Sequence, residues 1–271
     1  MLNVKRSFVI PFYKCLLGLA EPKPCASIDV HRILTSIVAA AVYVDDAYKI
    51  GYSYGLEGTL KGYGDLILEA ARSIAVEGGD ISTLVGLITY TAAYGFAKAR
   101  GRESLEHVLD GAKRIVSATS YTDAVKLLEA LKVLGYNEVL YLLEEKGITK
   151  HRIEAEYMNV EDLLREASGT ELAFMNPHTL AQVIRLAKEC VEKYRVRRPV
   201  CIWHYILHAN VESELKEKVW DAFRILVAHN CNVKRALAYI SEELRECQRL
   251  NKNYTLLAKA FLVALYVIEL F

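Results

Sequence analysis

The sequence predicts an all-α fold, a compact multi-helix bundle of ten or more helices with no sheet. Apolar residues recur at spacings of three and four along almost the whole chain, which is the period of an amphipathic helix. No stretch shows the strict alternation of a half-buried strand. Because the chain has no internal repeat and no low-complexity linker, we expect a single all-helical domain over residues 1–271.

The first well-marked helix is expected over residues 33–50, where one apolar stripe ends before Gly51. A glycine-rich connector follows as far as Gly64, and Asp65 then starts a helix as a first-turn acid or cap. Further helices are expected at 81–99, 104–117, 122–134, 137–145, 160–167, 179–194, 200–209, 212–229, 233–250 and 254–271.

Helix boundaries are marked by local signals. Thr122-Asp123 and Asn159, the latter followed by two acids, are typical helix starts, while Gly135 and Gly147 are typical stops. Loops are expected at residues 146–159 and 193–199. The apolar segment 256–271 contains Lys259 and Glu269 and is short for a membrane span, so we expect a buried closing helix.

Charge and cysteine usage bound the function. Thirty-four Lys and Arg balance thirty-three Asp and Glu, so a net charge of +1 argues against nucleic acid and membrane partners. Six cysteines without a Cys-x-x-Cys pair favour buried thiols in a reducing compartment, with the cytoplasm as the expected location. Only two glutamines occur beside seventeen tyrosines, a balance typical of heat-adapted proteins.

The segment Pro22-Lys23-Pro24 places a lysine between two of the five prolines. Each proline fixes φ and removes a backbone donor, so Lys23 is held on a stiff, non-helical arm that suits an anion. The alternative is a plain helix terminator after Ala20.

Two other segments could hold phosphate. Ser82-Thr83 starts an apolar helix after Gly78-Gly79-Asp80, where hydroxyls and free amides either accept a triphosphate or cap the helix. The basic run 193–198 either grips phosphates or is a solvated helix end.

Metal sites are weaker candidates. Cys201, His204 and His208 share one helical face and could bind zinc, although the same residues can simply pack in a core. Asp45 and Asp46 point in different directions, so one of them could reach magnesium, or Asp46 could pair with Lys49.

In this order, the segments resemble those of the triphosphoribosyl-dephospho-coenzyme A synthase family, especially its shorter archaeal branch. Pro22-Lys23-Pro24 resembles the family's Pro-Lys-Pro-Gly-Asn-Val, and Val30-His31-Arg32 resembles part of the family sequence just after that element. The segments 62–72, 82–87, 118–125 and 250–255 are similar to four later family motifs. This chain departs from the family motifs at three places. It has Cys25-Ala26 where the family has Gly-Asn, Ser82 and Leu84 where the family has two asparagines, and Lys252-Asn253 where the family has Pro-Gly.

The resemblance implies a transferase that moves a triphosphoribosyl group from ATP to dephospho-coenzyme A and releases adenine, with Mg²⁺ accompanying ATP. Because polar residues of the family motifs are replaced in this chain, the resemblance supports the fold and the binding of ATP or a coenzyme A-like nucleotide more than it supports the transfer reaction. The nucleotide-binding residues it implies are Lys23, His31, Arg32, Asp46, Ser82 and Thr83. The alternative is a non-catalytic helical protein that acts through self-assembly or a protein partner, since a homo-oligomer also fits the tyrosine-rich composition.

Overall fold

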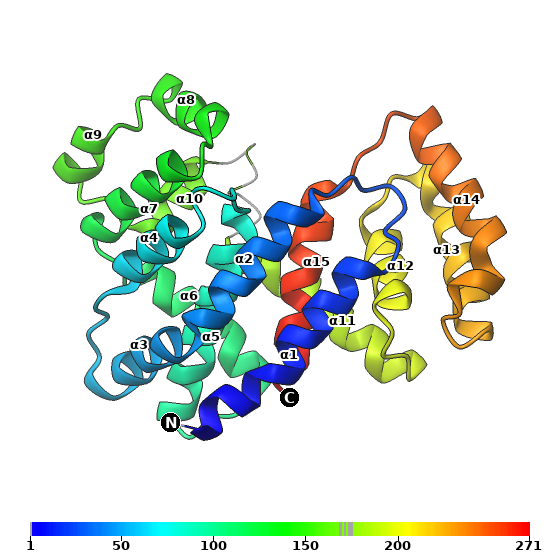
Figure 1. Ribbon diagram of the computed structural model, residues 1–271, viewed down its shortest axis with the longest axis horizontal. Coiled ribbons are helices and arrows are strands. Elements are labelled where there is room, and N and C mark those ends of the chain that lie inside the picture. The colour runs from blue at the N-terminus through cyan, green and yellow to red at the C-terminus, as the bar shows by residue number, and fades with distance from the viewer. Residues whose placement is uncertain (1, 168–169, 171, 173–175) are drawn as a thin grey trace.

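The computed structural model describes residues 2–167, 170, 172 and 176–271, and in these residues it contains fifteen α-helices and no strand (Figure 1). The predicted all-α class is therefore confirmed. The helices are α1 Leu2–Ala20, α2 Val30–Val42, α3 Val44–Glu57, α4 Tyr63–Ser73, α5 Ile81–Ala99, α6 Leu105–Ser117, α7 Tyr121–Val133, α8 Asn137–Glu145, α9 Lys150–Ala155, α10 Val160–Glu166, α11 Pro177–Tyr194, α12 Pro199–Asn210, α13 Ser213–Ala228, α14 Val233–Arg249 and α15 Thr255–Ile268.

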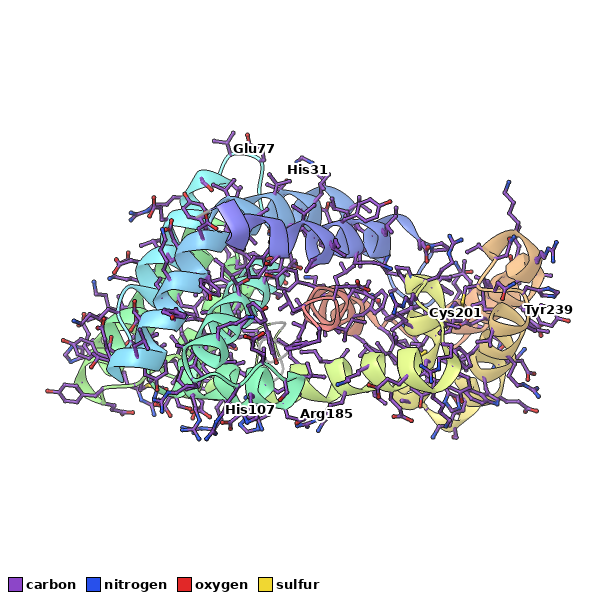
Figure 2. All side chains as sticks on the ribbon, turned by 90° about the horizontal axis from the view of Figure 1, so that it is seen from below. His31, Glu77, His107, Arg185, Cys201 and Tyr239 are labelled. Atoms are coloured by element: carbon purple, nitrogen blue, oxygen red, sulfur yellow. A yellow bond between two sulfur atoms is a disulfide. The ribbon has the colours of Figure 1, made fainter. Side chains whose placement is uncertain are left out.

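Two helices, α5 and α15, form the centre of the molecule. Both are buried around most of their circumference, as expected for helices that are apolar on nearly every face. Figure 2 shows α15 almost end on, between α1 and α2 on one side and α11 on the other. The C-terminal segment is thus the buried closing helix that its sequence predicts. No helix in the described residues is long and apolar enough to cross a bilayer.

The predicted helix over residues 33–50 is divided in the structure. It breaks at Tyr43, between α2 and α3, and α3 continues through Gly51 to Glu57, so the expected end before Gly51 is wrong. The glycines remain helical because α3 lies against α5 at close range. A Cβ on Gly51 would lie 1.8 Å from the Ala92 carbonyl oxygen, and one on Gly95 would lie 2.2 Å from the Tyr48 carbonyl oxygen.

We expect Gly51→Ala to lower the free energy of unfolding by about 3 kcal/mol, because the added methyl group forces two backbones apart. Gly111→Ala is the matched control: its Cβ would lie 3.1 Å from the Phe96 ring edge, and alanine favours the helix. Its effect is expected to stay within about 1 kcal/mol of zero. Urea unfolding followed by circular dichroism measures both, and equal losses would contradict a close approach at Gly51.

The helix boundaries follow the local signals closely. Reciprocal hydrogen bonds between Ser120 and Asp123 start α7, and the same arrangement between Asn159 and Asp162 starts α10. Gly135 and Gly147 adopt the left-handed conformation just after the helices that they terminate. The predicted loop at 146–159 is wrong in part, because residues Lys150–Ala155 form the short helix α9.

The cysteines differ from the expectation of mostly free thiols. Disulfides join Cys25 to Cys247 and Cys201 to Cys231, while Cys15 and Cys190 are free and buried. Cys231 directly precedes α14 and Cys247 lies in its last turn, so each end of α14 is covalently attached to another part of the fold. The helices α13 and α14 pack on one another at one end of the molecule (Figure 1).

Candidate nucleotide-binding site

Three helix starts lie close together at one end of the core, those of α2, α5 and α15. Arg32, in the first turn of α2, donates to the Gly79 carbonyl at 2.9 Å, immediately before α5. The Lys259 ammonium of α15 lies 2.5 Å from the carboxylate of Asp80, the N-cap of α5. Because the positive end of each helix dipole is directed toward this region, the region favours negative charge.

Asp80 occupies the start of α5. Its carboxylate accepts from the Thr83 amide at 2.7 Å, and its own amide donates to the Ser36 hydroxyl at 2.7 Å. Tyr136 adds a hydroxyl 3.1 Å from the Ile81 amide. The cap therefore supplies the negative charge that a phosphate would otherwise supply at this helix end.

Ser82 and Thr83 lie in the first turn of α5 and are fully buried. Among the described residues, neither side-chain hydroxyl has a hydrogen-bond partner. A buried hydroxyl without a partner costs about 1–3 kcal/mol, so such groups are uncommon in a folded core. Both hydroxyls are therefore polar groups inside the fold that lack a partner in the described part of the chain and are closed off from solvent.

A second set of contacts joins the loop after α1 to the start of α15. The Tyr254 amide donates to the Cys25 carbonyl at 2.8 Å. The Ser27 amide donates to the Thr255 hydroxyl at 3.0 Å, and that hydroxyl donates to the Ser27 carbonyl. Thr255 and Lys259 are about one helical turn apart, so their Cα atoms are separated by about 6 Å along α15.

Cys25 has a left-handed backbone, with φ of +64°. This conformation is uncommon for a residue with a Cβ and is natural for glycine.

A hollow of about 340 Å³ lies between this loop and the end of α14. Its walls are mostly polar or small, and the Cys25–Cys247 disulfide forms part of them. The lining residues are Cys25, Ala26, Ser27, Leu244, Cys247, Gln248, Asn251, Lys252 and Asn253.

Lys23 does not extend from the loop as a free cationic arm. Its ammonium donates to the carbonyls of Glu21 at 2.8 Å and Leu19 at 3.2 Å, and so caps the C-terminal end of α1. Burial lowers the pKa of Lys23 to about 8, against the opposing effect of the Glu21 carboxylate. The terminator reading of Pro22-Lys23-Pro24 describes this geometry better than the arm.

The other sequence-predicted residues are divided between this site and the surface. Arg32 joins Ser82 and Thr83 at the start of α5, with its guanidinium also 4.8 Å from the centre of the Tyr136 ring. His31 is exposed on α2 (Figure 2). Asp46 is exposed and pairs with Lys49 at 3.1 Å, as the alternative reading expects.

The proposed zinc ligands have other partners. Cys201 is bonded to Cys231, so it has no thiolate to offer a metal. His204 lies 2.8 Å from the Glu243 carboxylate, and the His208 ring packs on Trp220. In the part of the chain that the structure describes, no group of three His, Cys, Asp or Glu side chains could hold a metal ion.

Sequence reasoning missed Lys259 and Tyr136 as members of the site. Lys259 is a lone cation in an apolar helix, where a charge needs a buried partner, and that signal could have indicated its pairing with an acid. Tyr136 carries no comparable signal, because its hydroxyl reaches the start of α5 only through the packing of the α7–α8 connection.

A separate hollow of about 200 Å³ lies between the end of α5 and the start of α6. It is lined by three arginines, Arg100, Arg102 and Arg114, of which Arg114 pairs with Asp110. This surface is cationic but contains none of the sequence-predicted site residues.

Comparison of the chain with protein-family models, with curated proteins and with solved structures finds no match.

Proposed function

We propose that the protein binds ATP or a coenzyme A-like nucleotide in the hollow beside Ser27, as a divergent relative of the triphosphoribosyl-dephospho-coenzyme A synthases. The observation that carries the proposal is the meeting of segments far apart in the sequence. Three of the segments that carry the resemblance are residues 22–27, the start of α5 and residues 250–255. Hydrogen bonds join the first to Tyr254 and Thr255, an ion pair joins the second to Lys259, and the third leads into the start of α15.

The left-handed backbone of Cys25 supports the same proposal. Glycine is the residue that adopts positive φ most easily, and the resembled family has glycine at the position that aligns with Cys25. The positive φ of Cys25 therefore fits that alignment. Asp80 already supplies negative charge at the start of α5, so the support there for a phosphate-bearing ligand comes from the unpaired Ser82 and Thr83 hydroxyls.

Binding is better supported than transfer. Leu84 is fully buried and offers no hydrogen bond where the family has an asparagine. Asp80 is engaged by Lys259 and by the Thr83 amide, and the described residues contain no group of three His, Cys, Asp or Glu side chains that could hold a metal ion. We therefore derive no step through a metal.

Calorimetric titration with ATP and with dephospho-coenzyme A, each with and without Mg²⁺, tests the proposal. Ser27→Trp places an indole in the hollow from an exposed position and is expected to weaken binding at least about tenfold. Ser53→Trp is the matched control, because Ser53 is an exposed serine that lines a different hollow. Adenine release in the same mixtures measures transfer separately.

Two results would overturn the proposal. One is the absence of binding heat with every ligand at high protein concentration. The other is binding that Ser27→Trp leaves unchanged and that Arg102→Ala removes, because the ligand would then occupy the arginine-lined hollow.

A second candidate function, self-assembly without catalysis, is favoured by a specific observation on α1 and α2, which expose large apolar side chains. The two functions do not exclude one another.

For the location of the protein we propose the cytoplasm of a heat-adapted cell. Disulfides persist in oxidising compartments but also inside hyperthermophilic cells, and the glutamine-poor composition fits the second case. Alkylation of thiols at lysis, followed by mass spectrometry, measures whether the four cysteines are paired in the cell. Reduced thiols throughout the cellular pool would contradict disulfides in the cell, and with them the heat-adapted setting, but would leave the cytoplasm as the location.

A further inference from the structure

The outer faces of α1 and α2 form a continuous apolar surface, the α1–α2 face. Its most exposed members include Val9 at 63 % and Val42 at 66 %. Large apolar side chains are normally exposed singly, whereas here they follow two neighbouring helices. The large apolar residues of the face are Val9, Ile10, Tyr13, Leu16, Val30, Leu34, Val38 and Val42.

The α1–α2 face is almost free of charge. From Val9 to Ala20 every exposed residue is apolar, and on α2 the exposed ionisable side chain is that of His31. The exposed side of α14, by contrast, contains five charged residues. A solvated helix normally has such charges, so their absence from the α1–α2 face indicates a surface that is covered in the working protein.

The two helices present this surface in one direction. They contact one another and run antiparallel, and on the inner side α1 packs on α15 while α2 packs on α5. Figure 2 shows them along one edge of the molecule, and no described element covers their outer side. The exposed apolar side chains therefore lie on neighbouring helices along the same edge of the molecule.

The area of the patch matches a dimer interface. The exposed parts of its large side chains amount to roughly 700 Å² per chain, against about 800 Å² per partner in a standard interface and about 300–600 Å² for the largest patch of a typical monomer. An uncharged patch also meets an identical copy without like-charge repulsion.

We propose that the protein forms a two-fold symmetric homodimer in which the α1–α2 faces of two chains pack into a four-helix arrangement. A two-fold axis brings each helical pair against the same pair of the other chain, which is the geometry of an isologous interface. A membrane surface fits less well, because membrane-bound helices are rich in lysine and arginine beside the apolar face, and Val9–Val42 has few exposed cations.

Sedimentation velocity over a concentration series tests the dimer. The unmodified protein is expected to sediment as a dimer, and Val38→Glu is expected to raise the dissociation constant at least about 100-fold, because the carboxylates enter an apolar interface. Val76→Glu is the matched control, since Val76 is 95 % exposed and lies outside the face, and this variant is expected to remain dimeric.

Tyr13→Asp, on the other helix of the face, provides a second variant in case Val38→Glu lowers the thermal stability seen by circular dichroism. It is expected to produce monomers as well. A monomeric unmodified protein at high concentration would overturn the proposal, and so would a dimer that both variants leave intact. Flotation of a monomeric protein with lipid vesicles would assign the face to a membrane instead.

Discussion

Removing the Cys25–Cys247 disulfide is expected to lower the free energy of unfolding by about 5 kcal/mol. The bond joins residues 222 positions apart, so it removes a large amount of conformational entropy from the unfolded chain. The Cys201–Cys231 bond spans 30 residues and is expected to contribute about 3–4 kcal/mol by the same reasoning.

Urea unfolding of Cys25→Ala/Cys247→Ala and of Cys201→Ala/Cys231→Ala measures the two contributions. Cys190→Ala is the control for the loss of a buried sulfur, because Cys190 is free and buried. Reductant should bring the unmodified protein toward the stability of a variant that lacks both bonds. A larger loss for the shorter loop would contradict an origin in chain entropy.

Glu243→Ala is expected to lower the free energy of unfolding at pH 7 by about 4 kcal/mol, since it removes one partner of a fully buried pair. The His204 Nδ1 lies 2.8 Å from the Val200 carbonyl, which can only accept, so Nδ1 bears a proton. The contact of Nε2 with Glu243 then requires a second shared proton. Glu242→Ala, which removes a neighbouring exposed carboxylate paired with Lys218, is expected to cost less than about 1 kcal/mol.

The same pair sets a pH dependence. Burial lowers the pKa of His204, but the Glu243 charge and the hydrogen bonds to Glu243 and Val200 outweigh it, so the pKa is raised above 6.5. Because the folded protein holds the proton more tightly than the unfolded chain, the stabilisation is complete below pH 6.5 and is lost as pH rises through the raised value.

Glu243→Gln tests this sign. Burial without the carboxylate lowers the pKa of His204, so the variant should lose stability as the pH falls below about 6.5. From pH 6 to 9, the unfolding free energy of the unmodified protein minus that of the variant should decline, because groups such as Lys23 titrate in both proteins and cancel in the difference. Parallel profiles would show that His204 is not charged in the folded protein.

Most of the helical fold could be predicted from residue spacing, because most helices bury an apolar stripe and several, such as α7 and α10, begin at a recognisable cap. The failures lie where tertiary contacts override local preference. Gly51 looks like a helix end in the sequence, yet the close contact with Ala92 makes glycine the residue that fits a helix there. The short helix α9 is stabilised by the burial of Ile153. The local sequence gives too weak a signal to predict this helix.

The candidate site could be predicted only in part. Ser82 and Arg32 both lie at the start of α5, as the predicted nucleotide site requires. The Lys23 ammonium instead donates to carbonyls at the end of α1, which the sequence does not reveal. Disulfide partners such as Cys25 and Cys247 cannot be paired from spacing when they lie at opposite ends of the chain. Lys259 joins the site because helix packing brings Asp80 within its reach.

Cys25 and Cys247 both line the hollow and together close the longer disulfide, so the proposed ligand binding and the thiol–disulfide equilibrium involve the same two residues. Linkage then makes the two reciprocal. A ligand that binds the oxidised protein tenfold more tightly than the reduced protein must shift the equilibrium for reduction by the same factor of ten. The midpoint of reduction in a glutathione series can therefore detect occupancy of the hollow without following any chemical reaction.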